Sequence, residues 1–336
     1  MPKHWVLWAT LLTGCSQTTT DIGLPEDALE RIGRLLNQPP APLSVPNKRP
    51  FDLDPVAFSE ARIGFGNALA LGECGLVPLI AERNSALGRQ KEESIRFVYE
   101  WKIRHGLAEC VALQGDQDWF DQALAQKRQD LNAAINQLLL HSEEAEALRN
   151  PLSSAYGSIT QSASAYASAF AQIRATVLQA SQGQPPADAN QISALEDALK
   201  QWGDTRHHAA LGRAIRHTSA WLVSANQMQA RAIASNRLCP MGTATAEGKR
   251  LQQFIGGYFA RDIQTPIAHI RQAADAFQQQ WALLNDIPTL RSVDSEALLM
   301  LPEGLLSSFD DLWQTHIEQW QTLLAQCDLA PRAATR

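Results

Sequence analysis

Apolar residues recur at intervals of three and four along most of the chain, and alternation at every second position is nearly absent. Spacing of this kind gathers apolar side chains on one face of an α-helix, whereas a half-buried strand alternates at every second residue. The pattern predicts helices over residues 26–36, 54–72, 90–113, 119–140, 152–182, 190–236, 245–284 and 302–326. We therefore predict an all-α fold in which long antiparallel helices form a helical bundle.

Two interruptions organise the chain into two expected halves. Five prolines between residues 39 and 50 exclude a helix there and predict an extended segment on the surface. Residues 182–186, Gln-Gly-Gln-Pro-Pro, form the clearest internal linker. We expect an N-terminal helical half over residues 25–182 and a C-terminal helical half over residues 187–330. The polar tail that follows, residues 331–336, is expected to be disordered.

The first residues have the pattern of a secretory signal. Lys3 precedes an apolar run over residues 5–12, which is much shorter than the about 20 residues that a membrane-spanning helix needs. A basic start, a short apolar run and small residues before a cleavage site are typical of such a signal. Here the segment ends in Leu12-Thr13-Gly14-Cys15, which resembles a bacterial lipobox.

The lipobox resemblance implies that the chain is cleaved before Cys15 and that Cys15 is acylated. Residues 1–14 would then be a signal peptide, and residues 15–24 a lipidated polar tether. Two or more acyl chains hold a soluble protein stably on a membrane, whereas one chain gives only reversible binding. Ser16 stands where an Asp would favour retention at the inner membrane. We therefore expect the protein to be lipid-anchored at the periplasmic face of the outer membrane.

Four further cysteines remain for disulfides, namely Cys74, Cys110, Cys239 and Cys327. An even number of cysteines in an exported protein predicts disulfide bonds. Three connectivities are open, and we expect the sequential one, in which each bond staples its own half of the chain. No pair has the spacing of a zinc site and no histidine lies at ligand spacing from a cysteine, so we expect no metal.

The composition and the absence of known motifs argue against several classes of function. The 336 residues are 45% hydrophobic, which suffices for a large folded core. A net charge of −6 argues against a nucleic-acid partner, because phosphate backbones are bound by basic surfaces. The chain has no G-x-S-x-G, H-E-x-x-H, P-loop or G-x-G-x-x-G motif. We therefore assign no catalytic residue and no cofactor.

One polar motif interrupts an apolar stretch near residue 80. It consists of Glu82, Arg83, Asn84 and Ser85. Our first interpretation is structural, with Glu82 and Arg83 as a buried ion pair, since an unpaired buried charge would be costly. Asn84 or Ser85 would then cap the helix that follows. The alternative is a functional pocket built around Glu82 and Arg83.

The lipobox, Cys74, Cys110 and the run from Leu79 to Arg89 together resemble an uncharacterised family of Gram-negative lipoproteins. Its members carry a helical domain of unknown function with an Ala-Glu-Arg-Asn-Ser-x-Leu-Gly motif, matched here by residues 81–88. Gly257-Tyr258, Ile263-Gln264 and Pro266 fit the same pattern loosely. The resemblance spans most of residues 15–330. It implies an envelope location and helical character, and it brings no activity or catalytic residues.

Two other clusters contain residue types that occur in functional sites. Basic residues with helical spacing lie at Arg206, His207, His208, Arg213, Arg216 and His217. They could bind a metal or an anion, but nearby acidic residues favour a solvated face of mixed charge. Glu93-Ser94 resembles the Glu-Ser pair of helical peptidoglycan lyases, without the other signatures of those enzymes.

We therefore predict a non-catalytic binding or structural module of the cell envelope, held at the membrane through Cys15 and docking an envelope protein. The first alternative is a carrier of lipid or another hydrophobic ligand, with an apolar cavity between the predicted helices 55–72 and 90–113. The second is a cell-wall hydrolase using Glu82 or Glu93 at the bottom of an open groove. A docking module predicts a well-filled core instead.

Overall fold

The structure is a computed structural model that describes residues 23–59, 71–85, 92–114, 118–150 and 159–330. Within these ranges the chain is helical and has no β-strand, so the predicted all-α fold is confirmed. The elements are α1 (Ala28–Leu36), α3 (Val77–Asn84), α4 (Glu93–Gln114), α5 (Asp118–Leu140), α6 (Glu143–Arg149), α7 (Ile159–Ser181), α8 (Ala189–Asp204), α9 (His207–Ser235), α10 (Ala246–Phe254), η2 (Ile255–Gln264), α11 (Thr265–Ala282), α12 (Ser295–Leu298) and α13 (Leu305–Gln326).

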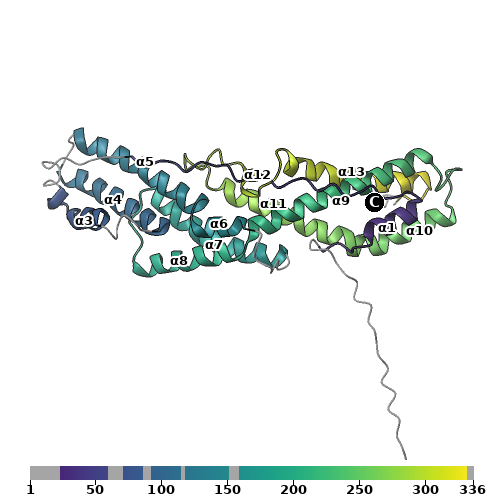
Figure 1. Ribbon diagram of the computed structural model, residues 1–336, viewed down its shortest axis with the longest axis horizontal. Coiled ribbons are helices and arrows are strands. Elements are labelled where there is room, and N and C mark those ends of the chain that lie inside the picture. Colours follow the sequence, from purple (N-terminus) through teal and green to yellow (C-terminus); the bar gives the residue numbers. More distant parts are fainter. Residues whose placement is uncertain (1–22, 60–70, 86–91, 115–117, 151–158, 331–336) are drawn as a thin grey trace, which may run out of the picture.

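The helices form an elongated rod (Figure 1). The antiparallel pair α4 and α5 forms one end of the rod together with α3, and α6, α7 and α8 lie in the middle. The 29-residue α9 continues from the middle towards the opposite end, over about 43 Å at 1.5 Å per residue. There it packs against α13 and α1, and α10 lies beside them.

One buried core runs through most of the rod. It joins residues from Leu24 to Cys327 and so includes both sides of the linker that we expected to separate two halves. Residues 182–188 are a short connection between α7 and α8, and these two helices pack on each other. A second, smaller apolar cluster lies at the α3–α5 end, made of Leu71, Leu76, Ile103, Leu107, Cys110 and Phe120. The core is therefore divided near that end of the rod.

An extended segment, residues 37–59, runs along the rod, and we call it the strap (Figure 1). Its proline-rich part cannot form internal hydrogen bonds, so side chains of the helices bind its carbonyl groups. Arg231 donates to the Pro39 carbonyl at 2.7 Å, and Ser224 donates to the Ala41 carbonyl at 2.9 Å. The strap thereby lies antiparallel to α9 before it continues towards α5.

The predicted helix over residues 54–72 is wrong at its start, because residues 54–59 belong to the strap. The backbone N–H groups of Val56 and Ser59 donate to the side chains of Asn136 and Asp130 on α5, at 3.2 and 2.6 Å. These tertiary bonds replace those that a helix would make. Residues 60–70 lie outside the described part of the chain.

Two other predicted helices are also interrupted. The helix expected over residues 190–236 divides into α8 and α9 at Arg206, which has a left-handed backbone with φ of 53°. The helix expected over residues 245–284 continues through α10, η2 and α11, but η2 is π-helical. Pro266 has no N–H and its ring crowds the preceding turn, so a wider turn before it relieves the clash.

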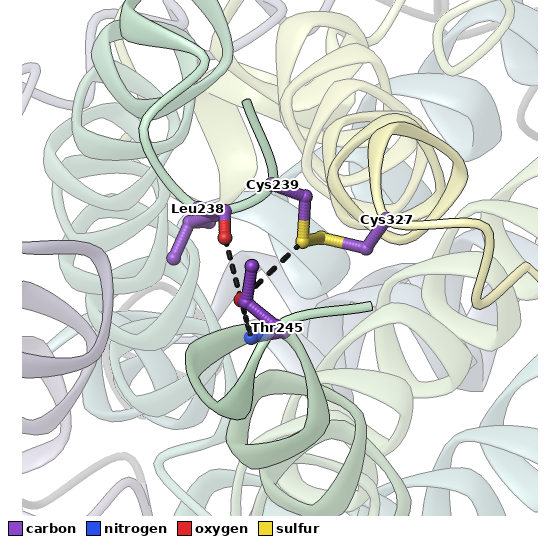
Figure 2. Close-up of a disulfide and its surroundings, with 5 residues drawn as sticks. Leu238, Cys239, Thr245 and Cys327 are labelled. Carbon is purple, nitrogen blue, oxygen red and sulfur yellow. Dashed lines mark hydrogen bonds between the residues drawn. A yellow bond between two sulfur atoms is a disulfide. The ribbon is translucent and has the colours of Figure 1, made fainter. Parts of the chain in front are cut away.

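The two predicted disulfides are present and join the cysteines in sequential order. Cys74–Cys110 holds the smaller apolar cluster, and Cys239–Cys327 ties the end of α13 to the loop before α10. Figure 2 shows Thr245 beside the second bond, where its hydroxyl donates to the Leu238 carbonyl at 2.6 Å. The same oxygen accepts the N–H of Gly248 and so caps α10.

Candidate functional site

A cavity of about 360 Å³ opens at the α3–α5 end of the rod, between α3, α4, α5 and the end of the strap. Five of its eleven lining side chains are charged: Glu82, Arg83, Glu93, Arg96 and Lys102. The apolar and aromatic part of its wall comes from Phe58, Leu79, Ile95, Val98 and Tyr99. We call this cavity the tip pocket. Its volume lies at the small end of the range for ligand pockets, about 300–1,000 Å³.

The tip pocket depends on how closely α3 approaches α4. Gly106 on α4 has no Cβ, and the side chain of Leu76 occupies the place where a Cβ would lie. Further along, the guanidinium of Arg83 lies 5.9 Å from the centre of the Tyr99 ring. The two contacts show that α3 runs antiparallel to α4. Since residues three and four apart share a helix face, Leu79, Glu82 and Arg83 all face the pocket.

A buried charge network holds Arg96, which lines the pocket. Arg96 pairs with Glu100 at 2.6 Å, and the Lys127 ammonium bridges Glu100 at 3.1 Å and Asp130 at 2.7 Å. Both carboxylate side chains are fully buried. Burial raises the pKa of Glu100, although the two cations oppose this. Burial acts to lower the pKa of Lys127, but Glu100 and Asp130 outweigh it and raise that pKa.

Two residues of the strap contact this network. Ser59 donates its backbone N–H to Asp130, and the guanidinium carbon of Arg96 lies 4.1 Å from the centre of the Phe58 ring. Arg96 is thus held between an aromatic face and the carboxylate of Glu100. A guanidinium has five N–H donors, so this arrangement orients Arg96 and leaves donors for another acceptor.

The structure brings the predicted polar motif to the pocket but does not bury it. Glu82 is exposed and Arg83 is only half-buried, and no residue of α3 is buried. The expected buried ion pair is therefore wrong, because α3 lies on the surface of α4. Ser85 ends α3, where its hydroxyl donates to the Glu82 carbonyl at 2.7 Å, so it does not cap the next helix. Asn84 is exposed.

Glu93, which we considered as a hydrolase residue, also lines the pocket. Sequence reasoning missed Arg96, Glu100, Lys127 and Asp130. A usable signal was present at Glu100, a single carboxylate within the otherwise apolar run Phe97-Val98-Tyr99-Glu100-Trp101. A charge on the apolar face of a helix needs a buried partner, and Arg96 lies one turn away.

The predicted solvated face around residues 206–217 is wrong for its two adjacent histidines. His207 and His208 have exposed fractions of 1% and 0%. His207 contacts the Ser162 hydroxyl at 3.1 Å, and His208 packs edge-on against Phe277. Burial lowers the pKa of His207 to about 4 and lowers that of His208 as well. Both therefore belong to the aromatic core between α7, α9 and α11.

Cys15 and the predicted lipobox lie outside the described residues. Within the described ranges, no group of three or more His, Cys, Asp or Glu side chains is arranged to hold a metal ion. In the same ranges, no helix combines the length and the apolar character needed to cross a bilayer.

Comparison with known proteins gives a family but no characterised relative. No curated protein and no solved structure matches the chain. Residues 26–331, which include all the helices described above, match a family described as "Protein of unknown function (DUF3080)". The match covers far more than half of the 336 residues. The chain therefore belongs to this family of unknown function.

Proposed function

We propose that the protein is a lipid-anchored binding module of the bacterial envelope that presents the tip pocket at a distance from its anchor. The observation that carries the proposal is where the tip pocket and the tethered first helix lie along the rod. The tip pocket lies at the α3–α5 end of the rod, whereas α1, the first helix after the tether, lies towards the other end (Figure 1).

The start of the fold is held firmly near α10 and η2. Leu24 is fully buried, and Gly23 lies beside Pro266 at the start of α11. Arg31 on α1 pairs with Asp27 at 2.6 Å, and its guanidinium lies 4.7 Å from the centre of the Tyr258 ring on η2. A tether that ends at residue 24 would therefore join the rod here.

The length of the strap limits the distance between the end of α1 and the tip pocket. It connects the end of α1 to the tip pocket in extended conformation over residues 37–59. An extended residue spans at most about 3.3 Å, so the strap covers at most roughly 75 Å. A rod anchored near α1 would then hold the pocket well away from the lipid surface, within reach of soluble molecules or other proteins.

Two features support an envelope location. The lipobox ending in Cys15 supplies the anchor, and the disulfides Cys74–Cys110 and Cys239–Cys327 are suited to an oxidising compartment. The pocket also favours binding of a polar partner over carriage of lipid. A carrier cavity was expected between residues 55–72 and 90–113, whereas this pocket lies between α3 and α4 with only Phe58 from the first of those segments, and nearly half of its lining side chains are charged.

Membrane fractionation tests the anchor. We expect the wild-type protein in the outer-membrane fraction and Cys15→Ser in the soluble fraction, with both disulfides intact in a non-reduced digest. Retention of Cys15→Ser on membranes would contradict the proposal.

A photoreactive side chain at Ile95, which lines the pocket, tests binding there, and the exposed Met241 near the other disulfide is the control position. We expect adducts in intact cells at Ile95 and not at Met241. Equal labelling at both would argue against the pocket as the binding site.

A further inference from the structure

We propose that the Cys74–Cys110 disulfide is a reducible bond that controls the tip pocket, because its reduction by a dithiol lets α3 separate from α4 and removes one wall of the pocket. This regulation rests on the proposed binding function, since it acts on the same site. Three observations carry the inference: the position of the bond, the small apolar burial of α3, and the unequal exposure of the two disulfides.

The bond joins the two walls of the pocket. Cys74 lies in the turn just before α3, and Cys110 lies on α4, with 5.5 Å between their Cα atoms. Leu79, Glu82 and Arg83 follow on α3 and line the pocket together with side chains of α4. The bond therefore fixes the start of the helix that forms one side of the pocket.

Little apolar burial holds α3 on the rod. The helix has eight residues, none of them is buried, and no side chain caps its first turn. An isolated helix shorter than about 12 residues is marginally stable in water, so α3 depends on the contacts that keep it in place. The buried side chain next to it is that of Leu76, which packs over Gly106 just before α3 begins.

Leu76 belongs to the smaller apolar cluster, and the bond stabilises that cluster. Cys110 is one of its buried members, and the cluster is much smaller than the core that joins Leu24 to Cys327. A region with few buried apolar contacts opens at a lower free-energy cost than the whole protein. The bond closes a loop over 36 positions and so restricts the open state of this region. Reduction therefore favours local opening of α3 while the rest of the rod stays folded.

The two disulfides differ in their access to a reductant. Thiol–disulfide exchange begins when a thiolate attacks one sulfur, so its rate depends on access to that sulfur. Cys239 and Cys327 have exposed fractions of 1% and 0%, and that of Cys110 is 0%. Cys74 is partly exposed. A reductant can therefore reach the first bond through Cys74, whereas both sulfurs of the second bond belong to buried residues.

The exchange balances with a dithiol as the reductant. Its thiolate attacks Cys74 Sγ, the S–S bond breaks, and Cys110 leaves as a thiolate that takes up a proton. The second thiol of the reductant then attacks the mixed disulfide and releases the Cys74 thiolate, which also takes up a proton. The protein gains two electrons and two protons, and the dithiol becomes a disulfide.

Opening of α3 changes one side of the pocket and leaves the other intact. Arg83 leaves the ring of Tyr99, whose centre now lies 5.9 Å from its guanidinium carbon. Arg96 keeps its partner Glu100, because both residues lie on α4. The oxidised protein therefore has a formed pocket, whereas the reduced protein has an open surface that binds the same ligand more weakly.

Graded reduction of the full chain tests the order in which the two bonds open. The chain carries Cys15→Ser, so that Cys15 supplies no competing thiol. We expect dithiothreitol to open Cys74–Cys110 at least about tenfold faster than Cys239–Cys327, because access limits the exchange. Alkylation of the freed thiols and mass spectrometry of the peptides measure both rates. Equal rates, or faster opening of Cys239–Cys327, would overturn the proposal.

Hydrogen exchange on the protein in which only Cys74–Cys110 is reduced tests the release of α3. Peptides that cover α3 should exchange about tenfold faster or more than in the oxidised protein, and peptides of α9 should keep their rates. The double variant Cys74→Ser, Cys110→Ser should show the same fast exchange without a reductant. Unchanged exchange in α3 of the reduced protein would overturn the proposal. Equal acceleration in α9 would also overturn it, because the rod would then unfold as a whole.

Photoreactive adducts at Ile95 separate this proposal from the proposed function. We expect the double variant Cys74→Ser, Cys110→Ser to form several-fold fewer adducts in intact cells than the parent protein. Undiminished adducts in the double variant would preserve the binding module and reject its regulation. The absence of adducts in the parent protein, together with fast exchange of α3 on reduction, would reject the binding function and confirm the release of α3.

Discussion

His316 should make the stability of this protein depend on pH in a way that a single substitution removes. The side chain is fully buried between α9 and α13. Its Nε2 accepts the indole N–H of Trp320 at 3.0 Å, so Nε2 carries no proton. Its Nδ1 then donates to the Asn226 side-chain oxygen at 2.8 Å. The structure therefore holds the neutral imidazole with both nitrogens satisfied.

The sign of the effect follows from the direction of the pKa change. Burial lowers the pKa of His316 to about 3, whereas a histidine in an unfolded chain has a pKa of about 6.5. The unfolded state thus binds a proton first as the pH falls. Stability is complete above about pH 6.5 and is lost progressively between there and about pH 3. At pH 5 the loss from His316 alone is about 2 kcal/mol in the free energy of unfolding.

Urea denaturation of the Cys15→Ser protein at pH 7.5 and at pH 5 measures this loss. We expect His316→Gln to lose about 2 kcal/mol less than the parent protein between the two pH values, because an amide can donate and accept but does not titrate. His269→Gln on the exposed side of α11 is the matched control and should behave like the parent. The comparison is between pH values, so a uniform destabilisation by the substitution cancels. An unchanged pH dependence in His316→Gln would refute the reasoning.

Three further predictions concern stability and use the same denaturation assay. Replacing Cys239 and Cys327 together by Ser should cost about 5 kcal/mol, because the bond closes a loop over 88 positions, and a loss below about 1 kcal/mol would contradict this. Lys127→Met should cost about 3–5 kcal/mol, since it leaves two fully buried carboxylates without their shared ammonium group, and a neutral effect would show that the network is not structural. Gly212→Ala should cost about 1–3 kcal/mol through collision of the new Cβ with the carbonyl of the residue after α12. Gly256→Ala on η2 meets open space and is the control, and equal losses at both glycines would refute the packing argument.

The helical character of the protein was accessible from the sequence because helix periodicity is a local signal. Apolar residues at intervals of three and four require one buried helix face whatever lies opposite. The cysteines were equally informative, since an even number in a chain that is predicted to be exported indicates disulfides. What local patterning could not show was where tertiary contacts override it. Residues 54–59 are extended because Asn136 and Asp130 bind their N–H groups.

Burial of individual polar residues was decided by tertiary structure. His207 and His208 have basic neighbours in sequence, which indicated a solvated face, yet they enter the aromatic core around Tyr166. Conversely, Glu82 and Arg83 were expected to be buried and lie on the surface of the rod. A sequence records which residues share a helix face, but the partner of that face depends on packing.

In the candidate site, too, some features were predictable from the sequence and others depend on tertiary packing. The polar motif of α3 was visible in the sequence, as was Glu93, but neither indicates a pocket by itself. The pocket arises because Leu76 packs over Gly106 and brings α3 against α4. Its supporting network joins Glu100 to Lys127 across two helices. Short-range spacing therefore determined the helices and the disulfide chemistry. Only the packing of helices distant in sequence determined which charges meet, because electrostatic interactions depend on separation in space.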